Sequence, residues 1–400
     1  MRRNFEYYFL AVIIVFSTLS GFMRLPSFLY QVAMIFFLVI SLKQGNFRIK
    51  YVSILYVSFI VVCAFSILYN DPPSYFRSWQ RLSLFVFVLF CFSPFVICKE
   101  LIHSREKLYS GLLTVMLFFS VASFFAYFLG INFFQRGDEI LDMGHFGHFS
   151  GFFNHSMTLG PIGAITSVYS LTKFLLEKDK KHRLWWMLAF FICFSTILLS
   201  ASRGATAGGL LALLIVLYRY SKMQKKRFAK YIGIVSVIAL FLLPVIQFMA
   251  GGLIQKQDAN VEAGGSFSSR DEKYIARIGE IQDHFITGIG FATVDPNLDV
   301  VDVKNGGVEP STSWLAVFSM TGVFGFAIFV YLYIKSLRKA LNKVIDSFFS
   351  VALSGILTFF GVHMLVEGYV FAAGNILCGL YWLTLGVVDA KSRESRYWQI

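Results

Sequence analysis

Apolar runs long enough to cross a lipid bilayer recur along nearly the whole of this 400-residue chain. A helix needs about 20 consecutive apolar residues to cross the hydrocarbon core once. Hydrophobic residues make up 56% of the sequence and charged residues only 15%, which leaves too few polar side chains to cover a soluble globule. We therefore predict an integral membrane protein with about twelve helical spans, at 7–23, 25–42, 51–69, 80–97, 108–130, 156–177, 184–200, 203–220, 231–250, 312–334, 346–366 and 370–388.

The pattern within these runs is helical. A run such as IGIVSVIALFLLPVIQF is apolar on every face and lacks the two-residue alternation and turn signals of a membrane β-barrel. The first run has no small-residue cleavage site after it, so we expect a retained span instead of a signal peptide. The predicted fold is an all-α polytopic bundle that forms one transmembrane domain over residues 1–400.

Basic residues are concentrated in every second predicted loop. They include those of MRRN, KQGNFRIK, EKDKKHR, RYSKMQKKRFAK and the tail KSRESR. Because loops rich in Lys and Arg stay on the cytoplasmic side during insertion, both termini are predicted to be cytoplasmic. The net charge of +13 is then explained by insertion and by attraction to membrane lipids, and no nucleic-acid partner is expected.

Two predicted outer segments are much longer than the other connections. One covers about 132–154, and the other is a large loop at 251–310 between predicted spans nine and ten. Loops of this length are usually functional or disordered. In the second, SSRDEKYIARIGEIQDHF places apolar residues at helical spacing behind a Ser-Ser N-cap, which predicts an amphipathic helix packed on the bundle. These apolar residues are Tyr274, Ile275, Ile278, Ile281 and Phe285.

The hairpin LLSASRGATAGG, between predicted spans seven and eight, places Arg203 at the outer interface. A lone interfacial arginine often only reaches lipid phosphates. Here Gly204 and Gly208 form a small-xxx-small face that lets helices approach closely, and a guanidinium held in a packed bundle can bind phosphate in a bidentate way. The other arginines expected outside are Arg24, Arg77, Arg81, Arg136, Arg270 and Arg277.

These arginines favour an anionic substrate that arrives within the membrane plane. A proton- or cation-coupled transporter would carry carboxylates in mid-span, where this sequence has almost none. A flippase or exporter of lipid-linked sugars remains an alternative, but it would need charges along a path through the bundle. A scaffolding protein, the other alternative, would not need a cluster of arginines at the outer interface. The sequence contains neither a nucleotide-binding loop nor a recognisable metal-ligand spacing, so no cofactor is expected.

The extended hairpin LLSASRGATAGGLLALL resembles the signature of the O-antigen ligase-like family of bacterial envelope polysaccharide enzymes. This family includes Wzy-type repeat-unit polymerases as well as ligases. Three further stretches resemble the family in order and spacing: GHFSGFFNHSMTLGPIGAI, SSRDEKYIARIGEIQDHFITGIGFAT and STSWLAVFSMTGVFGFAIF. The resemblance extends over the C-terminal two thirds of the chain.

The resemblance implies a glycosyltransferase in the bacterial inner membrane that uses undecaprenyl-diphosphate-linked oligosaccharides, without metal or nucleotide sugar. It implies that Arg203 and Arg270 bind the diphosphate, with the Arg270 helix and TGIG forming a lid. Paired R-x10-G spacings, Arg136 to Gly147 and Arg277 to Gly288, resemble those of Wzy polymerases. A chain-length regulator of the polysaccharide co-polymerase type is a further partner that this family suggests.

One departure from the family pattern favours polymerase over ligase. Ligases carry a His-Asn pair where this chain has Ser311 and Thr312. Orienting two substrates and stabilising a leaving diphosphate are then the main tasks, with a base at the outer interface. The candidate catalytic residues are Arg203, Arg270, His155, Glu309 and Glu367, and the candidate substrate-binding residues are Arg136, Arg277, Gly288 and Ser311. His155 has the alternative role of a hydrogen bond within its own turn.

The predicted topology can be tested with reporter fusions. A reporter enzyme that is active only outside the cytoplasm should be active when it is fused after residue 280, because the 251–310 loop is predicted to be external. The same reporter fused in the basic segment at 178–183 should be inactive and serves as the control. If only the fusion at 178–183 were active, the predicted orientation would be wrong and the termini would lie outside the cytoplasm.

Overall fold

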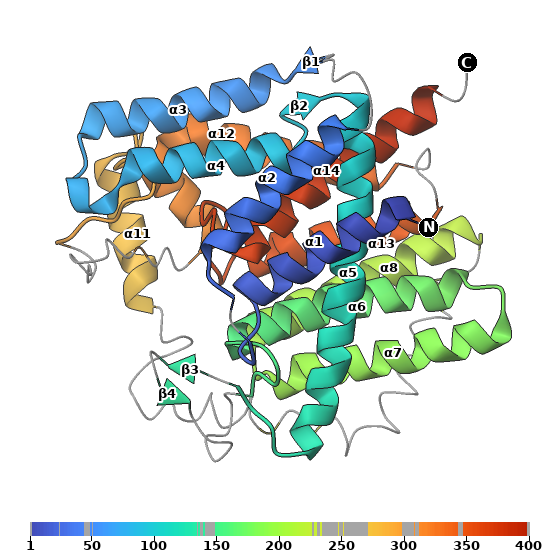
Figure 1. Cartoon of the computed structure of the whole chain (residues 1–400). Helices are drawn as coiled ribbons and strands as arrows, with labels where there is room; N and C mark the ends of the chain where they lie inside the picture. Colours follow the sequence, from blue (N-terminus) through green and yellow to red (C-terminus); the bar gives the residue numbers. More distant parts are fainter. Residues whose placement is uncertain are drawn as a thin grey trace.

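The protein is a bundle of α-helices, as the sequence predicts (Figure 1). The computed structural model describes residues 2–23, 25–43, 51–133, 149–225, 271–297, 312–342 and 347–397, with short pieces at 49, 135–136, 139–140, 228–229, 233, 247, 251 and 308. The first half of the chain contributes α1 (Arg2–Thr18), α2 (Phe28–Leu42), α3 (Ile54–Asn70), α4 (Ser78–Phe92) and α5 (Lys99–Phe128). The second half contributes α6 (Ser156–Leu176), α7 (Lys180–Leu199), α8 (Arg203–Met223), α11 (Asp271–Asp283), α12 (Ser313–Ala340), α13 (Ser347–His363) and α14 (Ile376–Tyr397).

Four short strands form two small antiparallel pairs outside the helices. Strand β1 (Tyr51–Val52) pairs with β2 (Val96–Ile97) between the start of α3 and the end of α4. Strand β3 (Gln135–Arg136) pairs with β4 (Glu139–Ile140) at the other end of the bundle.

The helices form two groups that meet on α5 and α14. One group contains α6, α7, α8 and α13, and the other contains α2, α3, α4 and α12. The long helix α5 crosses α1, α6 and α7 steeply and also packs on α14. Residues 376–390 of α14 are all buried, as expected for a helix that is apolar on nearly every side and has neighbours all round. Helix α14 is therefore the centre of the bundle.

Five of the described helices are long and apolar enough to cross a membrane: α5, α6, α7, α8 and α12. Shorter apolar helices cover Phe5–Thr18, Phe28–Leu42, Ile54–Asn70 and Phe348–His363. A helix overlaps every predicted span that the described residues include, whereas most of the predicted span at 231–250 lies outside them. The protein is thus a multi-pass helical membrane protein, and the count of about twelve spans stays a prediction.

Two predicted spans contain non-helical backbone. The predicted span 370–388 begins with irregular chain, because α14 starts only at Ile376. Helix α12 is interrupted at Gly322, which has φ 66° and ψ −172°. Both interruptions lie towards the same end of the bundle as the hairpin of α7 and α8, and they shape the site described below.

A buried arginine holds the opposite end of the bundle together. The Arg105 side chain of α5 is only 1% exposed, and its guanidinium donates to the carbonyl oxygens of Cys91 (2.9 Å), Phe90 (2.9 Å) and Val96 (3.1 Å). Two of these carbonyls belong to the last turn of α4, where helical partners end. Arg105 therefore supplies the donors that the end of α4 needs inside the protein.

Candidate functional site

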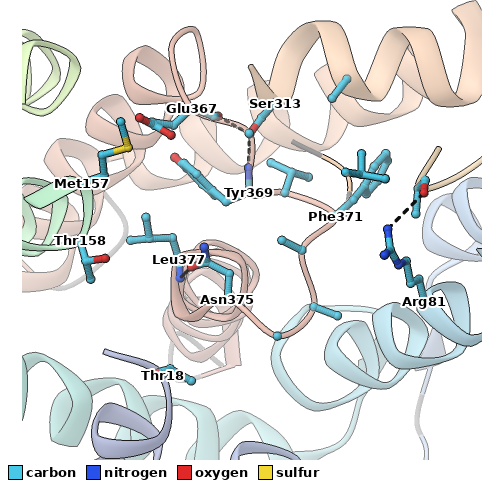
Figure 2. A pocket seen from close by; sticks show the side chains of 18 of the residues that line it. Thr18, Arg81, Met157, Thr158, Ser313, Glu367, Tyr369, Phe371, Asn375 and Leu377 are labelled. Atoms are coloured by element: carbon cyan, nitrogen blue, oxygen red, sulfur yellow. Dashed lines mark hydrogen bonds between the residues drawn. The ribbon is translucent and has the colours of Figure 1, made fainter. Parts of the chain in front are cut away.

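A cavity of about 610 Å³ lies at the end of the bundle that carries the α7–α8 hairpin. This volume falls within the range of about 300–1,000 Å³ typical of small-molecule sites. Its walls come from the ends of α1, α4, α6, α12 and α14, and from the irregular connection at 364–375 (Figure 2). The polar lining residues include Arg81, Asn154, His155, Glu367, Tyr369 and Asn375. Segments far apart in the sequence therefore converge on one polar cavity.

Hydrogen bonds from the start of α12 hold the 364–375 connection in place. The Ser313 backbone N–H lies 3.0 Å from both the Met364 and Glu367 carbonyl oxygens. The Ser313 hydroxyl donates to the Glu367 carbonyl (2.7 Å) and accepts from the Tyr369 N–H (3.0 Å). Thr312 Oγ1 adds a bond to the Met364 carbonyl at 2.8 Å. The backbone of the connection is thereby satisfied by α12, and its side chains line the cavity.

Two of the predicted catalytic residues, His155 and Glu367, line this cavity. Both side chains are half-buried, and they come from the start of α6 and from the connection after α13. In Figure 2, Glu367 lies at one side of the cavity and Arg81 at the other, with Tyr369 and Asn375 between them. The structure thus places a carboxylate and a guanidinium on opposite sides of one polar space.

The role of His155 is restricted by its own hydrogen bond. His155 is the N-cap of α6, and its Nδ1 accepts from the Met157 backbone N–H at 3.0 Å. A neutral imidazole that accepts at Nδ1 carries its proton on Nε2. The local turn role that the sequence suggested is therefore present, and it occupies Nδ1. Glu367 is accordingly a better candidate for the base than His155.

Arg203 begins α8 beside the cavity and is half-buried, but it is not among the lining residues. The next residue, Gly204, lies directly against Val366: a Cβ on Gly204 would be 2.2 Å from Val366 Cγ2. Gly208 lies one turn further along the same face and contacts Phe359 of α13. This is the close helix approach that the small-xxx-small pattern predicts. It places Arg203 at the Glu367 side of the cavity.

Arg81 was only one of several outer arginines in the sequence, whereas the structure makes it a cavity residue. Its side chain comes from the first turn of α4, and its Nη1 lies 3.4 Å from the Ala292 carbonyl oxygen. Its position at the outer end of a predicted span is the same signal that identified Arg203. That signal alone could not rank it above Arg24 or Arg77.

His363 is a second residue that the sequence did not single out. It is 1% exposed at the end of α13, and its ring stacks between Phe359 and Tyr369, with centroid distances of 5.0 and 5.6 Å. Its Nδ1 lies 3.4 Å from the hydroxyl of Tyr369, which lines the cavity. His363 therefore contacts a side chain of the cavity wall without itself being among the lining residues.

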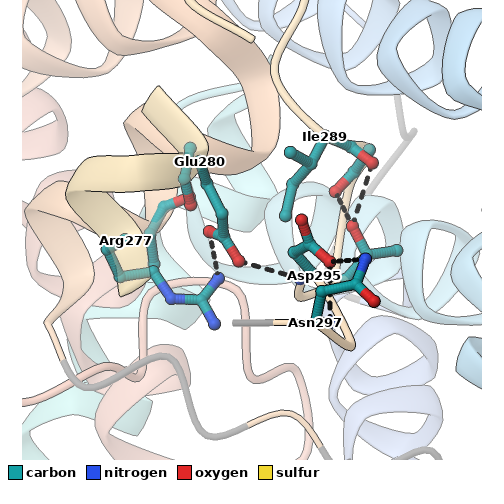
Figure 3. Close-up of polar contacts among 9 residues, drawn as sticks. Arg277, Glu280, Ile289, Asp295 and Asn297 are labelled. Atoms are coloured by element: carbon teal, nitrogen blue, oxygen red, sulfur yellow. Dashed lines mark hydrogen bonds and ion pairs between the residues drawn. The ribbon is translucent and has the colours of Figure 1, made fainter. Parts of the chain in front are cut away.

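Arg277 lies away from the cavity lining in a buried ion pair. Its Nη1 lies 2.6 Å from Glu280 Oε2, and neither side chain is exposed (Figure 3). Glu280 Oε1 also accepts from the Asp295 backbone N–H at 2.8 Å. Burial raises the pKa of Glu280, although Arg277 beside it acts in the opposite direction. The pair ties α11 to the chain at 289–295, of which Ala292 lines the cavity.

The helix predicted behind the Ser-Ser sequence is confirmed at Asp271–Asp283, and it packs on α12. Only part of its apolar stripe is covered. Ile275 and Ile278 are 70% and 46% exposed, whereas Arg277 and Glu280 are buried. The buried face of this helix therefore carries the ion pair and the contact with the Asp295 N–H.

Gly288 joins the end of this segment to the break in α12. Its φ is +67°, and a Cβ would be only 2.5 Å from the Met320 carbonyl carbon. Ile289 N–H donates to Ser319 O (2.8 Å), and Val323 N–H donates to Phe285 O (2.9 Å). The TGIG segment is therefore bonded backbone to backbone into the Gly322 break. A side chain at Gly288 would separate the two chains.

The remaining predicted residues cannot be placed at the cavity. Arg270, Glu309 and Ser311 lie outside the described residues, and Arg136 is described only as part of the strand β3. Among the described residues, no three His, Cys, Asp or Glu side chains form a group that could hold a metal ion.

The fold and the cavity define a multi-pass membrane protein with a polar site at one end of its bundle. Residues 188–330 match the protein-family model described as O-Antigen ligase. The match includes α8, α11 and the first part of α12, and it confirms the resemblance to the O-antigen ligase-like family. No curated protein matches the chain.

Because the Arg277–Glu280 pair is buried, a variant that loses both charges is predicted to be more stable than a variant that loses only one. Arg277→Met leaves the Glu280 charge buried without its partner and should lower the free energy of unfolding by about 3–5 kcal/mol. The double variant Arg277→Met, Glu280→Gln should be more stable than this single variant, because Gln still accepts from the Asp295 N–H. Thermal unfolding in detergent measures both.

The pH dependence of the stability of these variants is the control for this prediction. Burial raises the pKa of Glu280. Protonation of Glu280 at low pH should remove the unpaired buried charge that destabilises the Arg277→Met variant, so this variant is expected to be more stable at pH 5 than at pH 8. The double variant should show a smaller change. Equal stability of the single and double variants would contradict a buried charge at Glu280.

Proposed function

We propose that this protein is a Wzy-type polysaccharide polymerase that joins undecaprenyl-diphosphate-linked oligosaccharide repeat units at the outer face of the bacterial inner membrane. The main observation in favour is that one polar cavity has Arg81 on one side and Glu367, with Arg203 nearby, on the other. A polymerase must hold two diphosphates, one on the donor and one on the acceptor. Two arginine positions across one cavity suit that requirement.

The reaction transfers a glycan from one lipid carrier to the next repeat unit. A hydroxyl oxygen of the acceptor sugar forms a bond to the anomeric carbon of the donor, and the bond from that carbon to the diphosphate oxygen breaks. The hydroxyl proton goes to the Glu367 carboxylate, and an arginine stabilises the charge that develops on the leaving diphosphate. The His155 Nε2–H donates to a sugar or phosphate oxygen. Tyr369 and Asn375 supply further polar contacts to the sugars.

O-antigen ligase is the second candidate, and the description of the matching family model favours it. A ligase would use the same donor and transfer the glycan to the lipid A core. Ser311 and Thr312 in place of the His-Asn pair of ligases argue against it, as does the second arginine position at Arg81.

Deletion of the gene distinguishes these functions on a gel of surface glycan. Loss of a polymerase should remove the long-chain ladder and leave at most one repeat unit on its carrier or core. Loss of a ligase should instead leave long polymer on undecaprenyl diphosphate and a bare core. That second pattern would replace the polymerase proposal.

Complementation of the deletion tests the site. Glu367→Gln should reduce polymer formation by about 10²–10⁴-fold, the usual contribution of a general base. Arg81→Ala, Arg203→Ala and Arg270→Ala should each cost about 1.5–3 kcal/mol per lost charged hydrogen bond, or roughly ten- to more than a hundredfold.

Glu272→Gln and Arg77→Ala are matched controls, because both side chains are exposed and neither lines the cavity. Membrane abundance is measured for every variant. A variant that is fully active at normal abundance removes its residue from the site, and normal activity of Glu367→Gln would remove the assigned base.

A further inference from the structure

A second set of cavities lies at the opposite end of the bundle from the polar site. Two adjoining cavities of about 250 and 260 Å³ share Lys335 and Lys339 of α12. We call them together the basic groove. The first is also lined by Asp389 and Arg393 of α14 and is closed by residues of β1, β2 and the start of α3. The second is also lined by Arg338. Nothing in the proposed reaction uses these residues.

A buried carboxylate fixes two of the cations. Asp389 is 6% exposed, and its Oδ2 lies 2.6 Å from Arg393 Nε. Its Oδ1 is paired with Lys339. Because one carboxylate serves both side chains, the Lys339 and Arg393 charges are held in position but only half neutralised. The groove therefore contains a positioned cationic pair with a positive excess.

Two further cations, Lys335 and Arg338, project from the exposed side of α12 at the mouth of the groove. Among the described residues, neither forms an ion pair with a carboxylate. Lys335 lies over the ring of Tyr331, with Nζ 5.7 Å from the centroid. Four cations and one carboxylate thus surround the groove, a combination that suits a ligand with at least one negative charge.

The wall beside these charges is apolar and faces outward. Tyr331 and Ile334 line the second cavity and are 52% and 39% exposed, and Ile54 lines the first at 65% exposed. The exposed apolar side continues along α3 through Val61, Phe65 and Leu68. Because the exposed apolar side of a membrane-spanning helix faces lipid acyl chains, this strip places the groove beside the lipid. An amphiphile with an anionic head and an acyl chain matches both the charges and the strip.

We propose that the basic groove is a binding site for an anionic phospholipid of the leaflet at this end, which the loop charges predict to be cytoplasmic. The phosphate is held by Lys335 and Arg338 with help from Lys339, and an acyl chain lies along Ile334, Tyr331 and the exposed side of α3. Basic pockets between helices on the cytoplasmic side are a known setting for such headgroups. The site joins α3, α12 and α14, so lipid binding stabilises the contact between these helices.

The test uses the full-length protein in neutral detergent and native mass spectrometry. The probes are dioleoyl phosphatidylglycerol and, as the neutral comparison, dioleoyl phosphatidylcholine. In K335Q/R338Q, the apparent affinity of the tightest phosphatidylglycerol site should fall by at least about tenfold, since each basic residue near a membrane surface contributes about 1 kcal/mol. Phosphatidylcholine binding should not change.

The matched control is K178Q/K181Q, which removes the same charge from exposed side chains just before α7 and in its first turn, outside the groove. It should bind phosphatidylglycerol like the unmodified protein, and both variants should keep the elution volume and melting temperature of the lipid-free protein. An equal loss in both variants, no loss in K335Q/R338Q, or full competition by inorganic phosphate alone would each overturn the proposal.

Discussion

The polar cavity depends on the hydrogen bonds that Thr312 and Ser313 make to the non-helical chain after α13. In a bilayer, irregular backbone is tolerated only where protein or water satisfies its N–H and C=O groups. Here the first residues of α12 satisfy the carbonyls of Met364 and Glu367 and the N–H of Tyr369. Without these bonds, the 364–375 connection would have no stable path between α13 and α14, and the cavity would lose one wall.

A second break in regular structure, at Gly322 within α12, lies at the same end of the bundle as the polar cavity. Gly322 and Gly288 both have positive φ, and their backbones meet too closely for any side chain between them. The contact positions the turn that leads to Ala292, while the Arg277–Glu280 pair holds its other side. The break in α12 and the buried ion pair therefore hold the turn of which Ala292 lines the cavity. Regular helices alone would fill this volume with their own side chains.

The sequence predicts the helices well because run length and hydropathy are local properties. It predicts the cavity less well because the cavity depends on pairings between distant segments. His155 and Glu367 could be chosen as polar residues at the outer ends of predicted spans, yet Arg81 could not be ranked above Arg77, since only the tertiary fold turns one of them towards the cavity. The sequence also does not reveal that Arg277 is buried, because an Arg and a Glu three residues apart usually form an exposed pair on a helix surface. The Asp295 N–H that donates to Glu280 lies across a turn that no local pattern reveals.

Main chain and side chains have separate tasks in the cavity wall. The carbonyl of Glu367 and the N–H of Tyr369 are committed to Ser313, whereas the side chains of both residues line the cavity. A substitution at such a position changes the chemistry of the wall without removing the bonds that hold its backbone. The same bundle can therefore keep its fold while the acceptor changes, which is a physical route by which polymerases and ligases can share one family. In the proposed function, the acceptor is therefore selected by the side chains around Glu367, Tyr369 and Arg81.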